Sequence, residues 1–252
     1  MNGQMYQICA IVTVAKIALK NGGEIGYTPL KYEDETKFLF QDGSVARNVS
    51  EWFERTRNLG LDDMKFLSPT SMPDRSLLGF SNTTQSGIAC YFKDGSVSYL
   101  SPHWEFTRGS LQDGKWQITY NENKWENPPE QKPKFDDNRT EFVSILTRIK
   151  ALAQEIECEN FARLFQKALD ALNDDDTVAA EYIDKNILAL PRPNLGLFLA
   201  ADISDVFGAM GSWNDSPPYM AQQKGLGKEY DELSDELLRQ NRLALLYAMN
   251  EW

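Results

Sequence analysis

The sequence predicts an α+β protein, with an antiparallel β-hairpin-rich N-terminal half followed by an all-helical C-terminal half. Three observations support this class. Asp-Gly turns cut short aromatic and β-branched runs in the first half, prolines cluster after them, and apolar residues recur at helical spacing in the second half. We expect a β-rich region over 1–126, a Pro-rich linker over 127–138 and a helical region over 139–252, as two domains or as two layers of one.

The first element is expected to be an amphipathic helix that ends at Asn21-Gly22-Gly23. The β-branched run Ile11-Val12-Thr13-Val14 also allows a strand. No basic region precedes this apolar stretch, and Thr13 and Lys16 interrupt it, so it is expected to be neither a signal peptide nor a membrane span. The apolar positions step by three and four: Met5, Ile8, Val12, Ala15 and Leu19.

From Glu24 to Tyr120 the pattern indicates a mostly antiparallel sheet, because Asp-Gly tolerates positive φ at both residues and is a strong hairpin signal. One helix is expected to interrupt it, with Ser50 as its cap and Gly60 at its end. Trp52 and Phe53 would supply the apolar face of that helix. The three turns are Asp42-Gly43, Asp94-Gly95 and Asp113-Gly114.

Two of these hairpins resemble each other at a constant offset, which favours either a duplicated β unit or two hairpins that use the same turn chemistry. The offset is 52 residues, and the first set is Phe40, Asp42, Gly43, Ser44, Val45, Trp52 and Leu59. The second set is Phe92, Asp94, Gly95, Ser96, Val97, Trp104 and Leu111.

Beyond the linker, apolar stripes predict four main helices. The first begins near Asp137 or Asn138, either of which can cap it, and a phase jump near Glu159-Asn160 starts the second. A short helix near 178–187, a helix over 195–207 and a last helix from about Lys228 follow. The stripes are Phe142, Ile145, Leu146, Ile149, Leu152, Ala153 and Ile156; then Phe161, Leu164, Phe165, Ala168, Leu169 and Leu172; and finally Tyr230, Leu233, Leu237, Leu245 and Met249.

The charge balance excludes some classes of partner. Lys plus Arg number 26 against 37 Asp plus Glu, which gives a formal charge of −11. Such a field repels nucleic acid and anionic membrane surfaces and favours encounter with a basic protein, although it also serves solubility. Cys9, Cys90 and Cys158 lie among apolar neighbours and are expected to be reduced core thiols, so the expected compartment is the cytoplasm.

No motif fixes a chemistry. His103 is the only histidine, and a surface or strand-edge role is expected for it, because no second histidine, Cys-x-x-Cys pair or Gly-x-Ser-x-Gly elbow accompanies it. Neither a Walker-type loop nor a dinucleotide-binding glycine pattern occurs. We therefore expect no cofactor and no metal.

The segment from Phe207 to Tyr219 carries the candidate binding residues, because it is longer and richer in aromatic and polar groups than a helix connection requires. A functional interpretation places Trp213 and Tyr219 on a ligand or partner surface. Polar groups would come from Asn214, Asp215, Asp202 and Asp205, whose carboxylates can act as acid or base or hold a hard cation. The structural alternative is that the aromatics fill the core and the polar residues cap helix ends.

Acidic residues also crowd the first turns of the last helix, where they form either a solvated face that complements the helix dipole or a patch that binds a basic protein. They are Glu229, Asp231, Glu232, Asp235 and Glu236. Of the six tryptophans, Trp116 and Trp125 are the two expected to be exposed, because they flank a polar stretch.

The stretch from Ala201 to Trp252 resembles an uncharacterised bacterial protein family. The resemblance lies in Asp205-Val206-Phe207-Gly208-Ala209-Met210-Gly211-Ser212-Trp213-Asn214-Asp215 and Leu245-Leu246-Tyr247-Ala248-Met249-Asn250-Glu251-Trp252, and it extends to Phe66-Leu67-Ser68-Pro69-Thr70. It implies a bacterial cytosolic origin and brings no activity, cofactor or catalytic residue.

Two functional hypotheses follow, from different classes. The first is a non-enzymatic acidic binding protein, comparable in role to immunity or inhibitor proteins that neutralise a basic partner. The alternative is a hydrolase or transferase that uses Asp202, Asp205 and Asp215, with or without a divalent cation. A structural subunit that self-associates through exposed aromatics is a third. The oligomeric state is left open.

Overall fold

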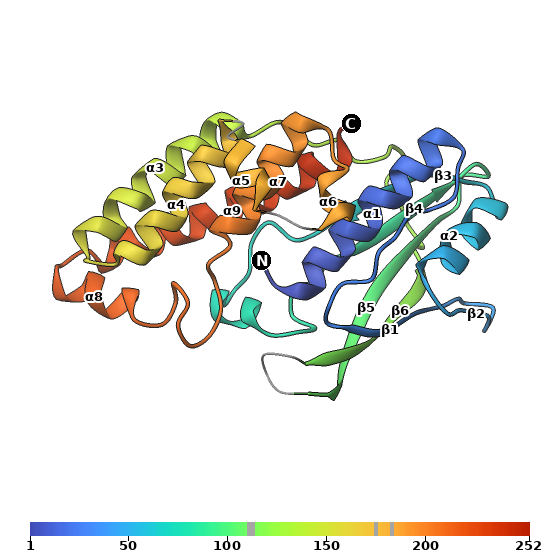
Figure 1. Ribbon diagram of the computed structural model, residues 1–252, viewed down its shortest axis with the longest axis horizontal. Helices are drawn as coiled ribbons and strands as arrows, with labels where there is room; N and C mark the ends of the chain where they lie inside the picture. The colour runs from blue at the N-terminus through green and yellow to red at the C-terminus, as the bar shows by residue number, and fades with distance from the viewer. Residues whose placement is uncertain (110–113, 174–175, 182–183) are drawn as a thin grey trace.

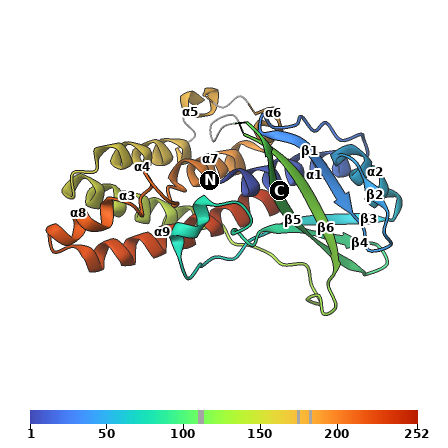
Figure 2. The same ribbon diagram turned by 90° about the horizontal axis from the view of Figure 1, so that it is seen from below.

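The computed structural model describes residues 1–109, 114–173, 176–181 and 184–252. It confirms the α+β class: a half built on one six-stranded sheet lies beside an all-helical half (Figures 1 and 2). Within the described ranges, no helix is both long and apolar enough to cross a membrane. The strands are β1 (Glu33–Leu39), β2 (Val45–Ala46), β3 (Leu61–Leu67), β4 (Gly87–Phe92), β5 (Val97–Arg108) and β6 (Lys115–Lys124).

The strand order in the sheet is β2-β1-β6-β5-β4-β3. Strands β3 to β6 form an antiparallel meander, in which each strand pairs with the next along the chain. Strand β1 then joins the meander beside β6, and this pair is parallel. The sheet is therefore mostly antiparallel, as expected, with one parallel pair that no local pattern indicated.

The predicted Asp-Gly hairpins at Asp42-Gly43 and Asp94-Gly95 are confirmed, although only the glycine of each has positive φ, at 82° and 84°. In the first turn Gly43 N donates to Phe40 O at 3.0 Å, and Asp42 Oδ1 accepts from the amide of Ser44 at 3.0 Å. The second turn has the same bonds. This is a type I turn followed by a glycine bulge, in which aspartate holds the turn through its side chain. Asp113 of the third turn lies outside the described residues.

The two similar hairpins share the turn and the antiparallel strand pair that it joins, and they differ after the second strand has begun. After the first turn the chain forms the two-residue strand β2 and then helix α2 (Val49–Asn58), which carries Trp52. After the second turn it forms the twelve-residue strand β5, which carries Trp104. The duplicated-unit interpretation is therefore wrong, since equivalent residues lie in a helix and in a strand, and the shared turn chemistry accounts for the likeness. Leu111 lies outside the described residues.

Helix α2 forms where expected, but Asn48 and not Ser50 is its cap. The side chain of Asn48 accepts a hydrogen bond from Glu51 N at 2.8 Å, and Glu51 Oε2 accepts from Arg47 N at 2.7 Å. Together these bonds satisfy donors at the helix start, as in a capping box. Gly60, with φ 90°, follows the end of the helix as predicted.

The N-terminal helix α1 (Gly3–Asn21) is confirmed as a helix, but it is buried on nearly all sides and is not amphipathic. It lies between the sheet and the helical half (Figure 1). Its buried polar groups therefore need partners. Gln7 donates to Thr36 at 3.1 Å and accepts from the Tyr120 hydroxyl at 3.0 Å, and the Lys16 ammonium donates to Asn250 O at 2.9 Å.

The helical half matches the predicted stripes. All seven members of the first stripe are buried, and so are the five inward positions of the last helix. Asp137 caps the first helix by accepting from Arg139 N at 2.9 Å. In the second stripe Leu164 is the exposed exception. The helices are α3 (Arg139–Glu155), α4 (Glu159–Leu172), α5 (Asp176–Ala180), α6 (Lys185–Leu188), α7 (Arg192–Ser204), α8 (Pro217–Gln223) and α9 (Gly227–Asn250).

The two halves share a hydrophobic core. One cluster of buried side chains includes residues of the sheet, of α1 and of helices α3, α4, α7 and α9. The end of α9 also reaches the sheet directly. The Asn250 amide group donates to Phe66 O and accepts from Phe66 N, both at 2.8 Å, along the outer edge of β3. The Pro-rich segment 127–138 therefore connects two halves that pack against each other and share one core.

Candidate functional site

The Phe207–Tyr219 segment divides into a buried part and an exposed part. Trp213 is fully buried and packs edge-to-face against Phe161 and Phe165 of α4. Its indole N–H donates to Ser234 Oγ of α9 at 2.8 Å. Trp213 therefore belongs to the helical core, as the structural alternative had it, and the interpretation that placed it on a binding surface is wrong, because its side chain has no access to a partner.

Asp215 supports the backbone of the Phe207–Tyr219 segment with its side chain, whereas Asn214 takes part through its backbone amide. Asp215 Oδ2 accepts from Gly211 N at 2.8 Å, and Asn214 N donates to the Ser212 hydroxyl at 3.2 Å. The first bond is typical of Asp in turns. In the second bond the side chain belongs to Ser212, and the side-chain nitrogen of Asn214 is buried with no hydrogen-bond partner among the described residues. Asp215 and, on α8, Tyr219 are the exposed members of the candidate set.

Asp202 and Asp205 each form an ion pair at the C-terminal end of α7. Asp202 Oδ1 lies 2.8 Å from the amino group of Met1. Asp205 Oδ2 lies 3.1 Å from Arg242 Nη1 of α9, and the two side chains are only 4% and 2% exposed. These two carboxylates therefore hold α7 against the N-terminus and α9, while Asp215 serves a different loop.

The acidic side chains of α9 lie beside the segment of residues 70–76, and we call this surface the acidic face. Asp231, Glu232, Asp235 and Glu236 line one side of a hollow of about 740 Å³, and the segment lines the other. Arg75 reaches across and pairs with both Asp231, at 3.5 Å, and Asp235. The two aspartates nonetheless keep 71% and 68% of their side chains exposed.

Exposed apolar side chains lie next to the acidic face. The short 3₁₀ helix η1 (Arg75–Gly79) packs its last residue on the α7–α8 connection, where a side-chain carbon on Gly79 would come within 2.8 Å of Gly208 Cα. Leu77 and Phe80 flank this contact on one segment and Met210 on the other, and Met210 is 92% exposed. We call these three the apolar knob. Scattered exposed apolar residues are ordinary, but each of these three lies within two residues of the Gly79–Gly208 contact.

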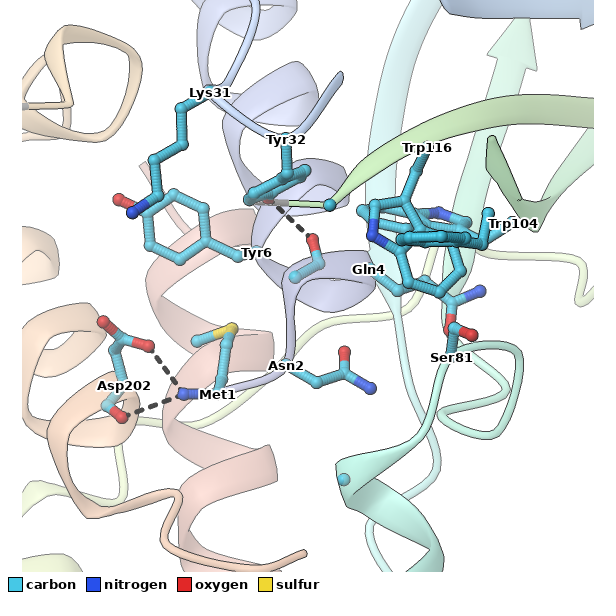
Figure 3. A pocket seen from close by; sticks show the side chains of 14 residues that line it. Met1, Asn2, Gln4, Tyr6, Lys31, Tyr32, Ser81, Trp104, Trp116 and Asp202 are labelled. Atoms are coloured by element: carbon cyan, nitrogen blue, oxygen red, sulfur yellow. Dashed lines mark hydrogen bonds and ion pairs between the residues drawn. The ribbon is translucent and has the colours of Figure 1, made fainter. Parts of the chain in front are cut away.

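A second concave feature, which we call the aromatic pocket, opens at the start of α1 and has a volume of about 750 Å³. Figure 3 shows Trp104 and Trp116 together on one side and Asp202 with Met1 on the other. Trp104 and Phe106 alternate along β5, and Phe106 pairs with Trp116 across β6. The period of two along strands therefore brings all three rings to one face of the sheet.

Three polar side chains around the aromatic pocket are engaged within the protein, and Lys31 and Ser81 also line it. The Tyr32 hydroxyl donates to Gly3 O at 2.9 Å (Figure 3). The side-chain amide of Asn2 donates to Leu78 O at 3.1 Å, and that of Gln4 donates to Pro102 O at 3.3 Å. Burial raises the pKa of Tyr6 well above its ordinary value, and the nearby carboxylate of Asp184 raises it further. The hydroxyl of Tyr6 therefore stays neutral.

The single histidine and the three cysteines lie outside these sites. His103 lies on β5 with more than half of its side chain exposed, beside Glu105. Cys9, Cys90 and Cys158 are free and buried as predicted, and burial raises the pKa of each thiol. Within the part of the chain that the structure describes, no group of three or more His, Cys, Asp or Glu residues is arranged to hold a metal ion.

The aromatic wall was not predicted from the sequence. The alternation Trp104-x-Phe106 and Trp116-x-Ile118-x-Tyr120 is a period-two signal that could have placed these rings on one face. The register between β5 and β6 sets Phe106 opposite Trp116. It could not be derived from the sequence, because the sequence pattern does not determine how many residues the turn between these strands contains. Trp116 and Trp125 are half-buried.

Comparison with known proteins adds no assignment: no family model, curated protein sequence or solved structure matches this chain.

Proposed function

We propose that this protein is a non-enzymatic acidic binding protein that recognises a basic protein partner, in the manner of immunity or inhibitor proteins. The observation that supports the proposal is the pairing of Arg75 with Asp231 and Asp235 of the acidic face. Two carboxylates one helical turn apart already hold a guanidinium there, and most of their surface stays open to solvent. A row of this kind can accept arginine or lysine side chains from a second protein.

The surroundings of the acidic face fit a protein partner better than a small cation. The hollow beside it is open to solvent, and the apolar knob of Leu77, Phe80 and Met210 lies on the adjoining segments. Protein interfaces combine such apolar anchors with a charged rim. The net charge of −11 adds a long-range field that speeds encounter with a basic protein.

The carboxylate-based enzyme alternative receives no support from the positions of its three residues. Asp205 is neutralised by Arg242, Asp202 pairs with the amino group of Met1, and Asp215 holds the amide of Gly211. A catalytic pair would need these groups to converge on one reacting atom. We therefore rank binding above catalysis, and we propose the cytoplasm as its compartment because the three cysteines are free thiols.

The test uses a partner captured from the native host with the wild-type protein at low salt and then purified. The test variant is Asp231→Asn/Glu232→Gln/Asp235→Asn. The matched control is Glu24→Gln/Glu126→Gln/Glu130→Gln, which removes the same charge from exposed positions elsewhere. We expect the test variant to raise the Kd at least about tenfold and the control to change it little.

A salt titration completes the test. Because the contact is electrostatic, wild-type affinity should fall as ionic strength rises, and it should fall less steeply in the acidic-face variant. Binding that is unchanged at high salt, or an equal loss in the control variant, would overturn the proposal.

A further inference from the structure

We propose that the aromatic pocket is a binding site for a small, neutral, planar aromatic molecule of one or two fused rings. This site shares no lining residue with the hollow of the acidic face and lies between the sheet and the end of α7, at the start of α1. The inference does not rest on the proposed function. The pocket volume of about 750 Å³ falls in the range of about 300–1,000 Å³ that is common for small-molecule sites.

The wall of the pocket is a continuous series of tilted rings. Tyr32 and Trp104 have centroids 5.4 Å apart at 44°, Trp104 and Trp116 are 5.7 Å apart at 53°, and Phe106 and Trp116 are 5.4 Å apart at 77°. These are the tilted and edge-to-face geometries that aromatic rings prefer among themselves. A flat ligand ring can therefore extend the series against Trp116 or Phe106, both of which keep exposed surface.

The wall is rigid enough to receive such a ligand. Trp104 is almost fully buried and pairs with Ile118 of β6. On its other side, its backbone N donates to Asn82 Oδ1 at 2.8 Å and its backbone O accepts from Asn82 Nδ2 at 3.0 Å. Trp116 is the second residue of the adjacent strand β6, and its amide donates to Tyr32 O at 2.9 Å, which fixes the neighbouring segment as well. A preformed wall binds without the entropic cost of ordering loose side chains.

The polar groups of the pocket argue against a sugar, the other common ligand of exposed tryptophan. Sugar recognition needs many free donors and acceptors for hydroxyl groups. Here the amide groups of Asn2 and Gln4 and the hydroxyl of Tyr32 are already bonded within the protein. A hydroxyl-rich ligand would lose bonds to water that the pocket does not replace, whereas a flat aromatic ligand needs few.

Ligand-observed NMR and calorimetry with defined probes test the proposal. The probes are indole and quinoline as aromatic ligands, with cyclohexanol, methyl glucoside and guanidinium as comparison ligands. We expect the aromatic probes to bind the wild-type protein with submillimolar to millimolar Kd, and the three comparison ligands to bind at least about tenfold more weakly.

Three variants locate the site. Trp116→Ala should raise the Kd for indole at least about tenfold, because it removes the stacking surface. Phe106→Ala, at a position 49% exposed, should raise it severalfold without affecting the fold. Trp125→Ala, at a half-buried tryptophan of a separate apolar cluster, should leave it unchanged.

Several outcomes would overturn the proposal. One is the absence of indole and quinoline binding at about 10 mM ligand, a concentration above the expected Kd. Others are equal or tighter binding of methyl glucoside or guanidinium, and equal weakening by Trp125→Ala and the pocket variants. Should Trp116→Ala fail to fold, the comparison of Phe106→Ala with Trp125→Ala decides the question.

Discussion

Arg242 and Asp205 form a buried ion pair between α9 and the end of α7. Removing one partner of such a pair leaves a charge without compensation in a place that water does not reach. We predict that Arg242→Met lowers the free energy of unfolding by about 3–5 kcal/mol, measured by urea denaturation. The control is Arg239→Met on the same helix, where the lost pair with Glu236 is exposed and costs about 0–1 kcal/mol. Equal effects in the two variants would contradict this account.

Lys16 is a second buried charge, and its effect depends on pH. Burial lowers its pKa from 10.5 to about 8, and the neighbouring ammonium of Lys65 acts in the same direction. Because the folded pKa lies below the unfolded one, the unfolded chain binds more protons between pH 8 and 10.5, and stability contributed by this residue rises with pH across that window.

We therefore predict that the wild type gains stability relative to Lys16→Met as pH increases, by on the order of 2 kcal/mol from pH 7.5 to 10. Urea denaturation of both proteins at each pH measures the difference between their free energies of unfolding. The other titrating groups are the same in both proteins, so their contributions cancel. A difference that stays flat or falls with increasing pH would contradict the pKa direction.

Residue-scale roles were the least predictable part of the candidate site. The sequence allowed two interpretations of Trp213, Asn214 and Asp215, and choosing between them requires the positions of α4 and α9. Asp205 meets Arg242 across 37 residues of chain, and no local pattern indicates which carboxylate an arginine will meet. Burial and pairing depend on tertiary contacts, so composition and spacing left them open.

At the scale of elements, helix α2 shows how a nearby residue can take the role expected of another. Asn48 caps the helix, while Ser50, expected as the cap, lies inside it. We predict that Asn48→Ala lowers the free energy of unfolding by about 1 kcal/mol. Ser50→Ala, at an exposed helical position, should change it by less than about 0.5 kcal/mol. Thermal or urea unfolding distinguishes the two, and the reverse order would restore Ser50 as the cap.

Elements with local signals were predicted well. The stripes of α3, α4 and α9 are encoded by residues three and four apart, and the Asp-Gly turns by adjacent residues, so both are visible in a single sequence. The sequence predicted that α1 is a helix, but it did not predict that this helix is buried between the sheet and the helical half. The amphipathic pattern implied an exposed face, whereas the polar residues Gln7, Thr13 and Lys16 each find a buried partner that lies elsewhere in the chain or in the preceding turn.

On the scale of the whole molecule, the shared hydrophobic core predicts that the two halves unfold together. Side chains of the sheet, α1 and the long helices form one cluster, so neither half can lose its packing alone. Native-state hydrogen exchange should give equal opening free energies for amides of β5 and α4, within about 1 kcal/mol. A clearly lower value throughout one half would instead show that the halves are independent domains.

The arrangement of the strands was beyond the reach of the sequence. The meander of β3 to β6 follows from consecutive hairpins, but the parallel pairing of β1 with β6 joins segments that lie far apart in the chain. Nothing in the pattern of either strand indicates its neighbour, because both present ordinary alternation. The aromatic pocket depends on this pairing, since it places Tyr32 beside Trp116, and it was therefore unpredictable for the same reason.

The contact of Asn250 with Phe66 has a consequence for how this protein behaves at high concentration. An open strand edge is a template on which another chain can add a strand, and it is a common starting point of aggregation. The Asn250 side chain occupies a backbone donor and acceptor on that edge, as a one-residue strand would. At the opposite edge, β2 is only two residues long. Both ends of the sheet are thus poor templates, so the protein can keep a six-stranded sheet without polymerising through it.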